Sequence, residues 1–283
     1  MALAKQLQST PHANLVFTSV GDRSNVSSWL HGRRNFDLWV TYYGDRAGHL
    51  KEIADYYTER KGAKFQNLHF AYQKWQALFK RYAAVFVMDD DLVIGAPEIS
   101  RLFDLRARYD LWALQPAFSL RGKISWPITR ANHRNKLRFT NFIEMTCPLF
   151  RRDKLEEFMA VYDPELVGWG CDWWFLEAMG DDLQGHVAVI DSITCVNPHD
   201  ISKGQREIDH LMPAIERKAI WDRIKRKYNI RSEDRGMYEY GAIPKPLVQR
   251  SLGMLANAWE QTWVDSEAPG RRAMGALRRR LLP

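Results

Sequence analysis

The sequence is poor in cysteine and contains no long apolar run. Its three cysteines show no C-x-x-C spacing, which argues against a disulfide framework and against a zinc knuckle. Residues 1–11 lack the apolar core of a signal peptide, and no later stretch approaches the ~18 apolar residues that span a bilayer. We therefore expect reduced cysteines in a cytoplasmic protein.

The chain also lacks the patterns of a nucleic-acid-binding protein. It carries a net charge of +7, but no helix-turn-helix, RNP-like or zinc pattern accompanies that charge. Much of the excess lies in a terminal cluster of arginines: Arg271, Arg272, Arg278, Arg279 and Arg280. This tail predicts attachment to the anionic inner face of a membrane, at about 1 kcal/mol per basic residue near the headgroups. The alternative is a solvated chain end, and no nucleic-acid partner is expected.

Strands and helices alternate along the chain. Hydrophobic residues make up 46% of its 283 residues, which excludes a disordered protein and provides for a large core. The predicted strands cover residues 15–20, 36–43, 63–65, 83–88, 110–116, 142–150 and 187–191. The predicted helices cover residues 68–82, 97–109, 153–162 and 173–179. The alternation predicts an α/β fold with a mostly parallel, mixed sheet flanked by helices. We expect this domain to cover residues 1–200 and a helical extension with a basic tail to cover residues 201–283.

Three consecutive acids, Asp89, Asp90 and Asp91, follow the apolar strand 83–88. Carboxylates held close together attract hard divalent cations such as Mn²⁺ or Mg²⁺. A strand followed by D-x-D resembles the signature of nucleotide-sugar glycosyltransferases with the GT-A fold. It also resembles the motif of haloacid-dehalogenase-type phosphatases, although that motif normally lies on the first strand and three strands precede it here. A helix cap is the plainest alternative, but a cap needs only one acid.

A second motif, G-W-G-C-D, covers residues 168–172. Gly170 allows a ligand to approach the backbone, and Trp169 offers a flat face of the kind on which sugars stack. Asp172 is then the candidate base that deprotonates an acceptor hydroxyl. The alternative is a helix cap that follows a glycine turn.

Weaker candidates lie at other strand ends. His199 follows the last strand and is a candidate metal ligand beside Asp89 and Asp91, although lone histidines are more often structural. Small polar residues after the first two strands are candidate contacts for a nucleotide base: Thr18, Ser19, Gly21 and Asp45.

An ordered series of segments resembles a plant and bacterial family of uncharacterised, glycosyltransferase-like proteins. The acid triplet is followed by residues 142–150 with Glu144, by residues 163–172 with the G-W-G motif, and by residues 187–191. The resemblance spans residues 14 to 200 and implies a GT-A-like fold, sugar transfer and a substrate-binding role for Glu144. His199 lies about two residues further from its strand than the family pattern places it.

These patterns together predict a metal-dependent glycosyltransferase of the hexosyltransferase type. Asp89 and Asp90 contact the nucleotide, and Asp91 ligates the metal with Asp89 or His199. The donor is a UDP- or GDP-linked sugar, and the acceptor is a glycan or a lipid-linked glycan. Two alternatives stay open: a haloacid-dehalogenase-type phosphatase, and a non-catalytic module that binds a nucleotide or glycan.

Overall fold

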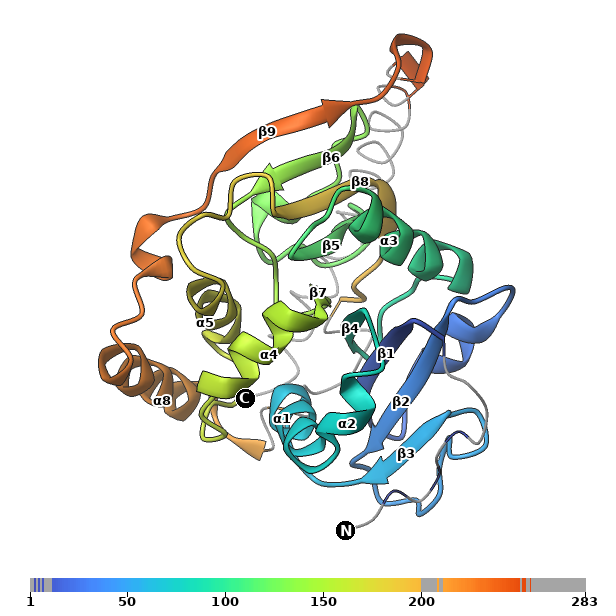
Figure 1. Cartoon of the computed structure of the whole chain (residues 1–283), viewed down its shortest axis with the longest axis vertical. Coiled ribbons are helices and arrows are strands. Elements are labelled where there is room, and N and C mark those ends of the chain that lie inside the picture. The colour runs from blue at the N-terminus through green and yellow to red at the C-terminus, as the bar shows by residue number, and fades with distance from the viewer. Residues whose placement is uncertain are drawn as a thin grey trace, which may run out of the picture.

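A mixed sheet of nine strands forms the centre of the molecule (Figure 1). The computed structural model describes residues 3, 5, 7, 12–199, 208, 211–249, 251, 252 and 255. The order of the strands in the sheet is β3-β2-β1-β4-β7-β5-β8-β6-β9. They are β1 Asn14–Val20, β2 Phe36–Tyr42, β3 Tyr56–Glu59, β4 Ala84–Asp89, β5 Ala113–Phe118, β6 Asn135–Thr140, β7 Leu149–Arg151, β8 Val187–Cys195 and β9 Glu239–Pro244.

Only β6 and β7 run against the direction of the other described strands. β1 pairs in parallel with β2 and β4, and β2 pairs in parallel with β3. β7 is antiparallel to both of its neighbours, β4 and β5. β5 and β8 are again parallel, and the antiparallel β6 separates β8 from β9. The predicted α/β class and the mostly parallel, mixed sheet are therefore confirmed.

Helices cover both faces of this sheet, which explains why its central strands are apolar throughout. On β4, Val85 and Val87 join one core, whereas Phe86 and Met88 join the other. Successive side chains of a strand point to opposite faces, so a strand covered on both sides has no polar position. The first core lies under α1 Lys64–Lys74, α2 Gln76–Phe79, α4 Arg152–Val161, α5 Cys171–Ala178 and α8 Ala214–Lys227. The second lies under η1 Val26–Leu30 and α3 Ala96–Arg108.

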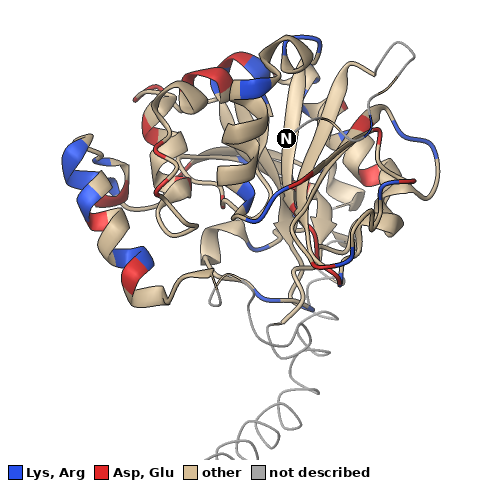
Figure 2. Ribbon diagram, turned by 90° about the horizontal axis from the view of Figure 1, so that it is seen from below, with Lys and Arg blue, Asp and Glu red and all other residues tan. Residues whose placement is uncertain are grey.

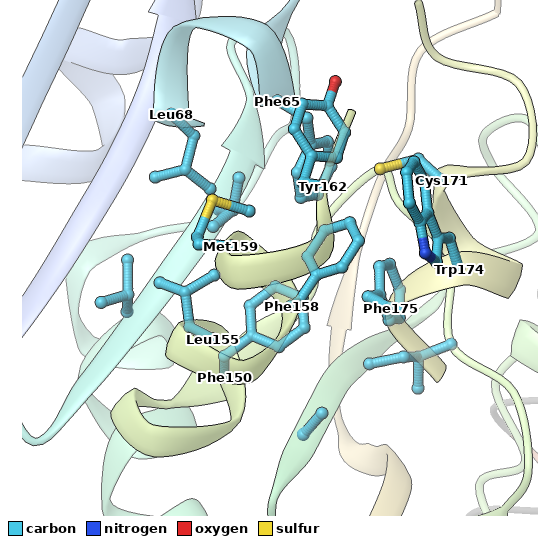
Figure 3. Close-up of a cluster of buried hydrophobic side chains, with 14 of the residues drawn as sticks. Phe65, Leu68, Phe150, Leu155, Phe158, Met159, Tyr162, Cys171, Trp174 and Phe175 are labelled. Atoms are coloured by element: carbon cyan, nitrogen blue, oxygen red, sulfur yellow. The ribbon is translucent and has the colours of Figure 1, made fainter. Parts of the chain in front are cut away.

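Aromatic rings fill the first core between α1, α4 and α5 (Figure 3). Phe158 of α4 lies edge-on to Phe65 of α1 and to Phe175 of α5, with ring centroids 5.9 and 5.8 Å apart. Phe150 of β7 contacts the same Phe175 at 5.1 Å. Each such side chain contributes about 1.5–3 kcal/mol when fully buried. These rings hold α5 against the sheet.

Two predicted strands differ from the structure. Residues 63–65 open α1 instead, because the Gln66 side chain accepts a hydrogen bond from the Ala63 amide and so stabilises the first turn. Of residues 142–150, only the end belongs to β7. The carbonyls of Thr146 and Pro148 accept hydrogen bonds from Asp89 and Val87 of β4, but Pro148 has no N–H to donate in return.

Residues after 200 add both a helix and a strand to this molecule. α8 was expected from the helical pattern, whereas β9 was not, because all of its side chains are at least partly exposed and show no apolar face. β6 was not predicted either, since it carries polar residues at most positions and its first half falls in the polar stretch 121–138, which indicated a loop. The helix η3 Ser232–Arg235 connects α8 to β9, and η2 Pro127–Thr129 precedes β6. The terminal arginine cluster lies outside the described residues.

α8 is the basic helix of the described part of the chain. It carries six basic and two acidic residues, and Figure 2 shows blue segments along its ribbon. Several of these charges are paired: Arg223 binds Glu165, and Lys227 Nζ lies 3.0 Å from Asp163 Oδ2. Within the described residues, every helix is too short or too polar to cross a bilayer.

Candidate functional site

The carboxyl ends of β1 and β4 mark the switch point of the sheet. From β1 the chain continues to β2 and β3 on one side, whereas β4 lies on the other side. Open α/β sheets bind ligands outside such a point. Ser19 pairs with Asp89 in the register of these two strands, so the acid triplet lies at this position as the sequence predicted.

Asp89 is paired with a buried lysine. Lys64 Nζ, at the first turn of α1, lies 2.7 Å from Asp89 Oδ1. The same ammonium donates to the carbonyls of Met145 at 2.6 Å and Thr146 at 2.9 Å. The Lys64 side chain is 7% exposed and that of Asp89 is 41% exposed. The lysine therefore lies behind Asp89, and part of the carboxylate faces solvent.

Asp90 and Asp91 are fixed to the turn that follows β1. The Gly21 amide donates to Asp90 Oδ2 at 3.0 Å, and the Asn25 amide donates to the Asp90 carbonyl at 2.7 Å. The Asn25 side chain donates to the Asp91 carbonyl. These bonds join the acid triplet to the end of β1.

Glu144 is buried beside the triplet. Its carboxylate accepts hydrogen bonds from the hydroxyls of Thr129 at 2.8 Å and Thr146 at 3.2 Å, and the Gln115 side chain accepts from its amide. Burial, with the negative charge of Asp89 nearby, raises the pKa of Glu144 to about 7, although the two hydroxyls favour the charged form. Glu144 therefore changes its charge near neutral pH.

Asp172 is the second buried acid of the site. It lies in the first turn of α5 and is 6% exposed. Burial and the negative charge of Glu144 raise the pKa of Asp172 to about 7, opposed by the Trp173 amide, which donates to its Oδ1 at 3.1 Å. The charge of Asp89 thus acts on Glu144, and the charge of Glu144 acts on Asp172. A buried acid poised near pH 7 is suited to proton transfer.

The G-W-G loop is held by α8. Gly170 has φ +86°, and a Cβ there would lie 2.1 Å from Cδ2 of the buried Trp221. This contact accounts for the glycine through packing. Trp169, in contrast, is 51% exposed, so its ring remains accessible to a ligand. The ion pairs from α8 to Asp163 and Glu165 fix the start of the same loop.

The predicted base contacts do not lie together. Thr18 points to the core under α3 and Ser19 to the core under α1, because side chains alternate along β1. The Ser19 hydroxyl accepts a hydrogen bond from Asn67 at 3.0 Å. Asp45 lies on an exposed turn, where Lys61 binds it at 2.6 Å. Of this group, only Ser19 and Gly21 adjoin the acid triplet.

His199 and Asp91 lie on neighbouring segments. An antiparallel bridge joins Val93, two residues after Asp91, to Val196, three residues before His199. Among the described residues, no three His, Cys, Asp or Glu side chains are placed to hold a metal ion by themselves. One carboxylate and one imidazole fit an ion that takes its other ligands from a bound diphosphate and water, as Mg²⁺ usually does. They do not fit an ion held by the protein alone.

Sequence reasoning missed four polar residues that organise the site: Lys64, Gln115, Thr129 and Thr146. Lys64 was assigned to a short strand, where its side chain would not face Asp89. A signal existed, since a lysine at the start of an amphipathic helix lies near the carboxyl end of the strand that the helix precedes or follows. The threonines carry no such signal, because they are brought to Glu144 by the path of a loop.

Comparison with known proteins gives similarities of structure at low sequence identity. No protein-family model and no curated protein matches the chain. Three solved structures of S. aureus TarS are similar. Residues 1–349 of TarS give a TM-score of 0.46 at 10% identity, covering 65% of this chain and 60% of that chain. The same portion in complex with UDP gives 0.49 at 12%, covering 78% and 72%. A further TarS structure gives 0.46 at 12%, covering 76% and 42%. The chain thus spans less than two thirds of two of these structures. Because all TM-scores are below 0.5, the proposals below depend on this chain's own residues.

Proposed function

We propose that this protein is a glycosyltransferase with a GT-A-like fold that moves a hexose from a UDP- or GDP-linked donor to a glycan or lipid-linked glycan. One observation carries the proposal: the acid triplet at the switch point lies near the buried Glu144, whose charge in turn acts on the buried Asp172, and burial raises the pKa of both acids to about 7. The triplet suits a nucleotide diphosphate and its cation, and the buried acids suit activation of a hydroxyl. The ordered series of motifs in the sequence supports the same reading.

In this proposal, one group of residues binds the donor and another binds the acceptor. Asp89 and Asp90 lie beside the end of β1 and contact the nucleotide. Asp91 and His199 would hold Mn²⁺ or Mg²⁺, and the ion would supply positive charge to stabilise the departing diphosphate. Asp172 accepts the proton of the acceptor hydroxyl if the anomeric centre inverts, and it orients the acceptor if the centre is retained. Glu144 and Trp169 complete the acceptor side.

Binding of a nucleotide tests this proposal directly. We expect calorimetric titration of UDP or GDP to show tighter binding with Mn²⁺ than with a chelator, and hydrolysis of a nucleotide sugar to follow the same metal dependence. Asp91→Asn should remove the metal effect and leave the melting temperature unchanged, because the amide has nearly the same shape as the carboxylate. Asp45→Asn is the matched control, since Asp45 lies on an exposed turn. Equal metal dependence in the Asp91 variant would contradict the assignment.

The phosphatase alternative has its own signature. It requires Asp89 as the nucleophile and predicts steady release of phosphate from simple phosphomonoesters, lost in Asp89→Asn. The sequence offers the pair Asp181 and Asp182 as the further acids of that mechanism, but this pair follows helix α5 instead of a strand. Asp181 is 85% exposed and binds Arg235 at 2.7 Å. Release of phosphate without turnover of any nucleotide sugar would favour this alternative. Nucleotide binding with no turnover of either kind would favour a binding module.

A further inference from the structure

The ammonium group of Lys64 has three partners, the largest number that it can serve. Its three donors match three acceptors: Asp89 Oδ1 and the carbonyls of Met145 and Thr146, all within 2.9 Å. Two of these acceptors belong to one loop and the third to β4. Lys64 therefore holds a fixed place, with little freedom to turn toward a ligand.

This fixed charge changes what Asp89 can bind. A divalent ion at the Asp89 carboxylate would lie within a few ångströms of an ammonium group that is 7% exposed, where water screens the repulsion between like charges poorly. A neutral hydroxyl meets no such repulsion. The exposed part of the carboxylate is therefore suited to accept hydrogen bonds from sugar hydroxyls and unsuited to coordinate a metal.

We infer that Lys64 is a positioning residue that takes the place of a metal ion at Asp89, so that Asp89 receives the ribose hydroxyls of the donor nucleotide and any cation binds on the side of Asp91 and His199. The choice of ribose depends on the proposed function. The claim that Lys64 excludes metal from Asp89 does not, because it concerns the two side chains alone.

Lys64 also connects the two halves of the site. Through Asp89 it holds the end of β4, and through the carbonyls of residues 145 and 146 it holds the loop that carries Glu144. Thr146 in turn donates to Glu144. One side chain thus fixes the end of β4 and the loop of Glu144 relative to each other.

Titration with Mn²⁺ alone tests the claim about metal. Free Mn²⁺ is measured by electron paramagnetic resonance for the wild type, Asp89→Asn, Lys64→Met and the double variant. We expect the wild type and Asp89→Asn to bind Mn²⁺ equally. Lys64→Met should bind it about tenfold more tightly, because the uncompensated Asp89 then becomes a ligand, and the double variant should return to the wild-type value. Weaker Mn²⁺ binding in Asp89→Asn than in the wild type would overturn the inference, and this comparison stands even if Lys64→Met does not fold.

Titration with nucleotides separates the inference from the proposed function. Asp89→Asn should weaken UDP binding by about tenfold but leave the affinity for 2′,3′-dideoxy UDP unchanged. Equal losses for both nucleotides would overturn the ribose contact. If the wild type bound no nucleotide under any condition, the proposed function would fail, whereas the Mn²⁺ comparison would still decide what Lys64 does.

Discussion

At the scale of single residues, the two buried acids should make the proposed transfer reaction depend on pH. Asp172 acts as a base only when ionised, so turnover should rise with pH through about 7, the pKa of that group. Glu144→Gln removes a neighbouring negative charge and should move this rise to lower pH. Asp172→Asn should lose about 10²–10⁴-fold in turnover and keep its donor affinity. Rate profiles between pH 5 and 9 check all three, and a rise that stays in place in Glu144→Gln would contradict the coupling.

The same acids should destabilise the fold at high pH. Their folded pKa values lie above the ordinary ones, so in both the folded and the unfolded state these two groups are protonated below about pH 4, and their contribution to stability is largest there. As pH rises toward 7 the unfolded state loses its protons first, and this contribution to stability is lost. Relative to the wild type, Asp172→Asn should therefore have a higher free energy of unfolding, and this difference should be on the order of 2 kcal/mol larger at pH 8 than at pH 5. Urea unfolding at both pH values distinguishes this result from the loss of a helix cap, which lowers stability at both.

The sequence was enough to predict where the acids of the site lie in the fold, but not their protonation states. Asp89 could be placed because an apolar strand ending in acids leaves little choice. The state of Asp172 could not be predicted, since it depends on burial by segments distant in the chain and on the charge of Glu144.

At the scale of elements, the junction between α5 and α8 should be sensitive to one methyl group. Gly170→Ala places a Cβ 2.1 Å from the Trp221 ring and also forces an L-residue to φ +86°. The left-handed conformation costs about 1–2 kcal/mol, and overpacking adds about 1–3 kcal/mol. We expect a loss of roughly 2–5 kcal/mol of unfolding free energy, measured by urea denaturation.

Gly180 provides the matched control at the other end of α5. Its φ is +89°, but a Cβ there meets nothing within 4 Å, so Gly180→Ala should show the conformational cost alone. Equal losses of unfolding free energy in the two variants would mean that contact with Trp221 is not the reason for a glycine at position 170. From the sequence we predicted that Gly170 leaves room for a ligand. Nothing near Gly170 in the sequence indicates that Trp221, about fifty positions later, fills that space.

At the scale of the whole molecule, the basic tail and the catalytic site should be separable. All residues of the proposed site lie before residue 200, whereas the arginine cluster begins at Arg271. The chain between them presents three apolar side chains at helical spacing, Val248, Leu252 and Leu255, each more than 60% exposed. We propose that this segment and the arginines together attach the protein to an anionic lipid surface.

A chain that ends at Ala268 should hydrolyse the soluble donor normally but fail to sediment with anionic vesicles. Replacement of the five arginines by lysine is the control and should preserve sedimentation, because the charge is unchanged. Sedimentation of the full chain should weaken as salt rises, since the Debye length is about 8 Å at physiological ionic strength. Equal sedimentation of the truncated and the full-length chain at low salt would show that the arginines do not attach the protein to the vesicles.

The alternation of strands and helices was enough to predict the α/β class and the place of β4. It was not enough to predict β6 and β9, which form one end of the sheet. An edge strand has no need of a regular apolar pattern when one side faces solvent. β9 is held by backbone pairing with β6, by the ion pair between Arg138 and Glu239, and by the packing of Tyr240 and Ile243 against the cores.

The position of β7 has a consequence for how the protein is made. β7 separates β4 from β5 in the sheet although it follows both in the chain. During synthesis, β4 and the acid triplet leave the ribosome first. The edge of β4 that pairs with β7 stays unpaired until residues 149–151 follow. The loop that carries Glu144 emerges immediately before β7 and enters the molecule with it. Closure of this edge of β4 and entry of Glu144 are therefore expected to be a single event in biosynthesis, whereas Asp172 is added later with α5. A chain that ends before β7 thus carries the acid triplet without either of the two buried acids.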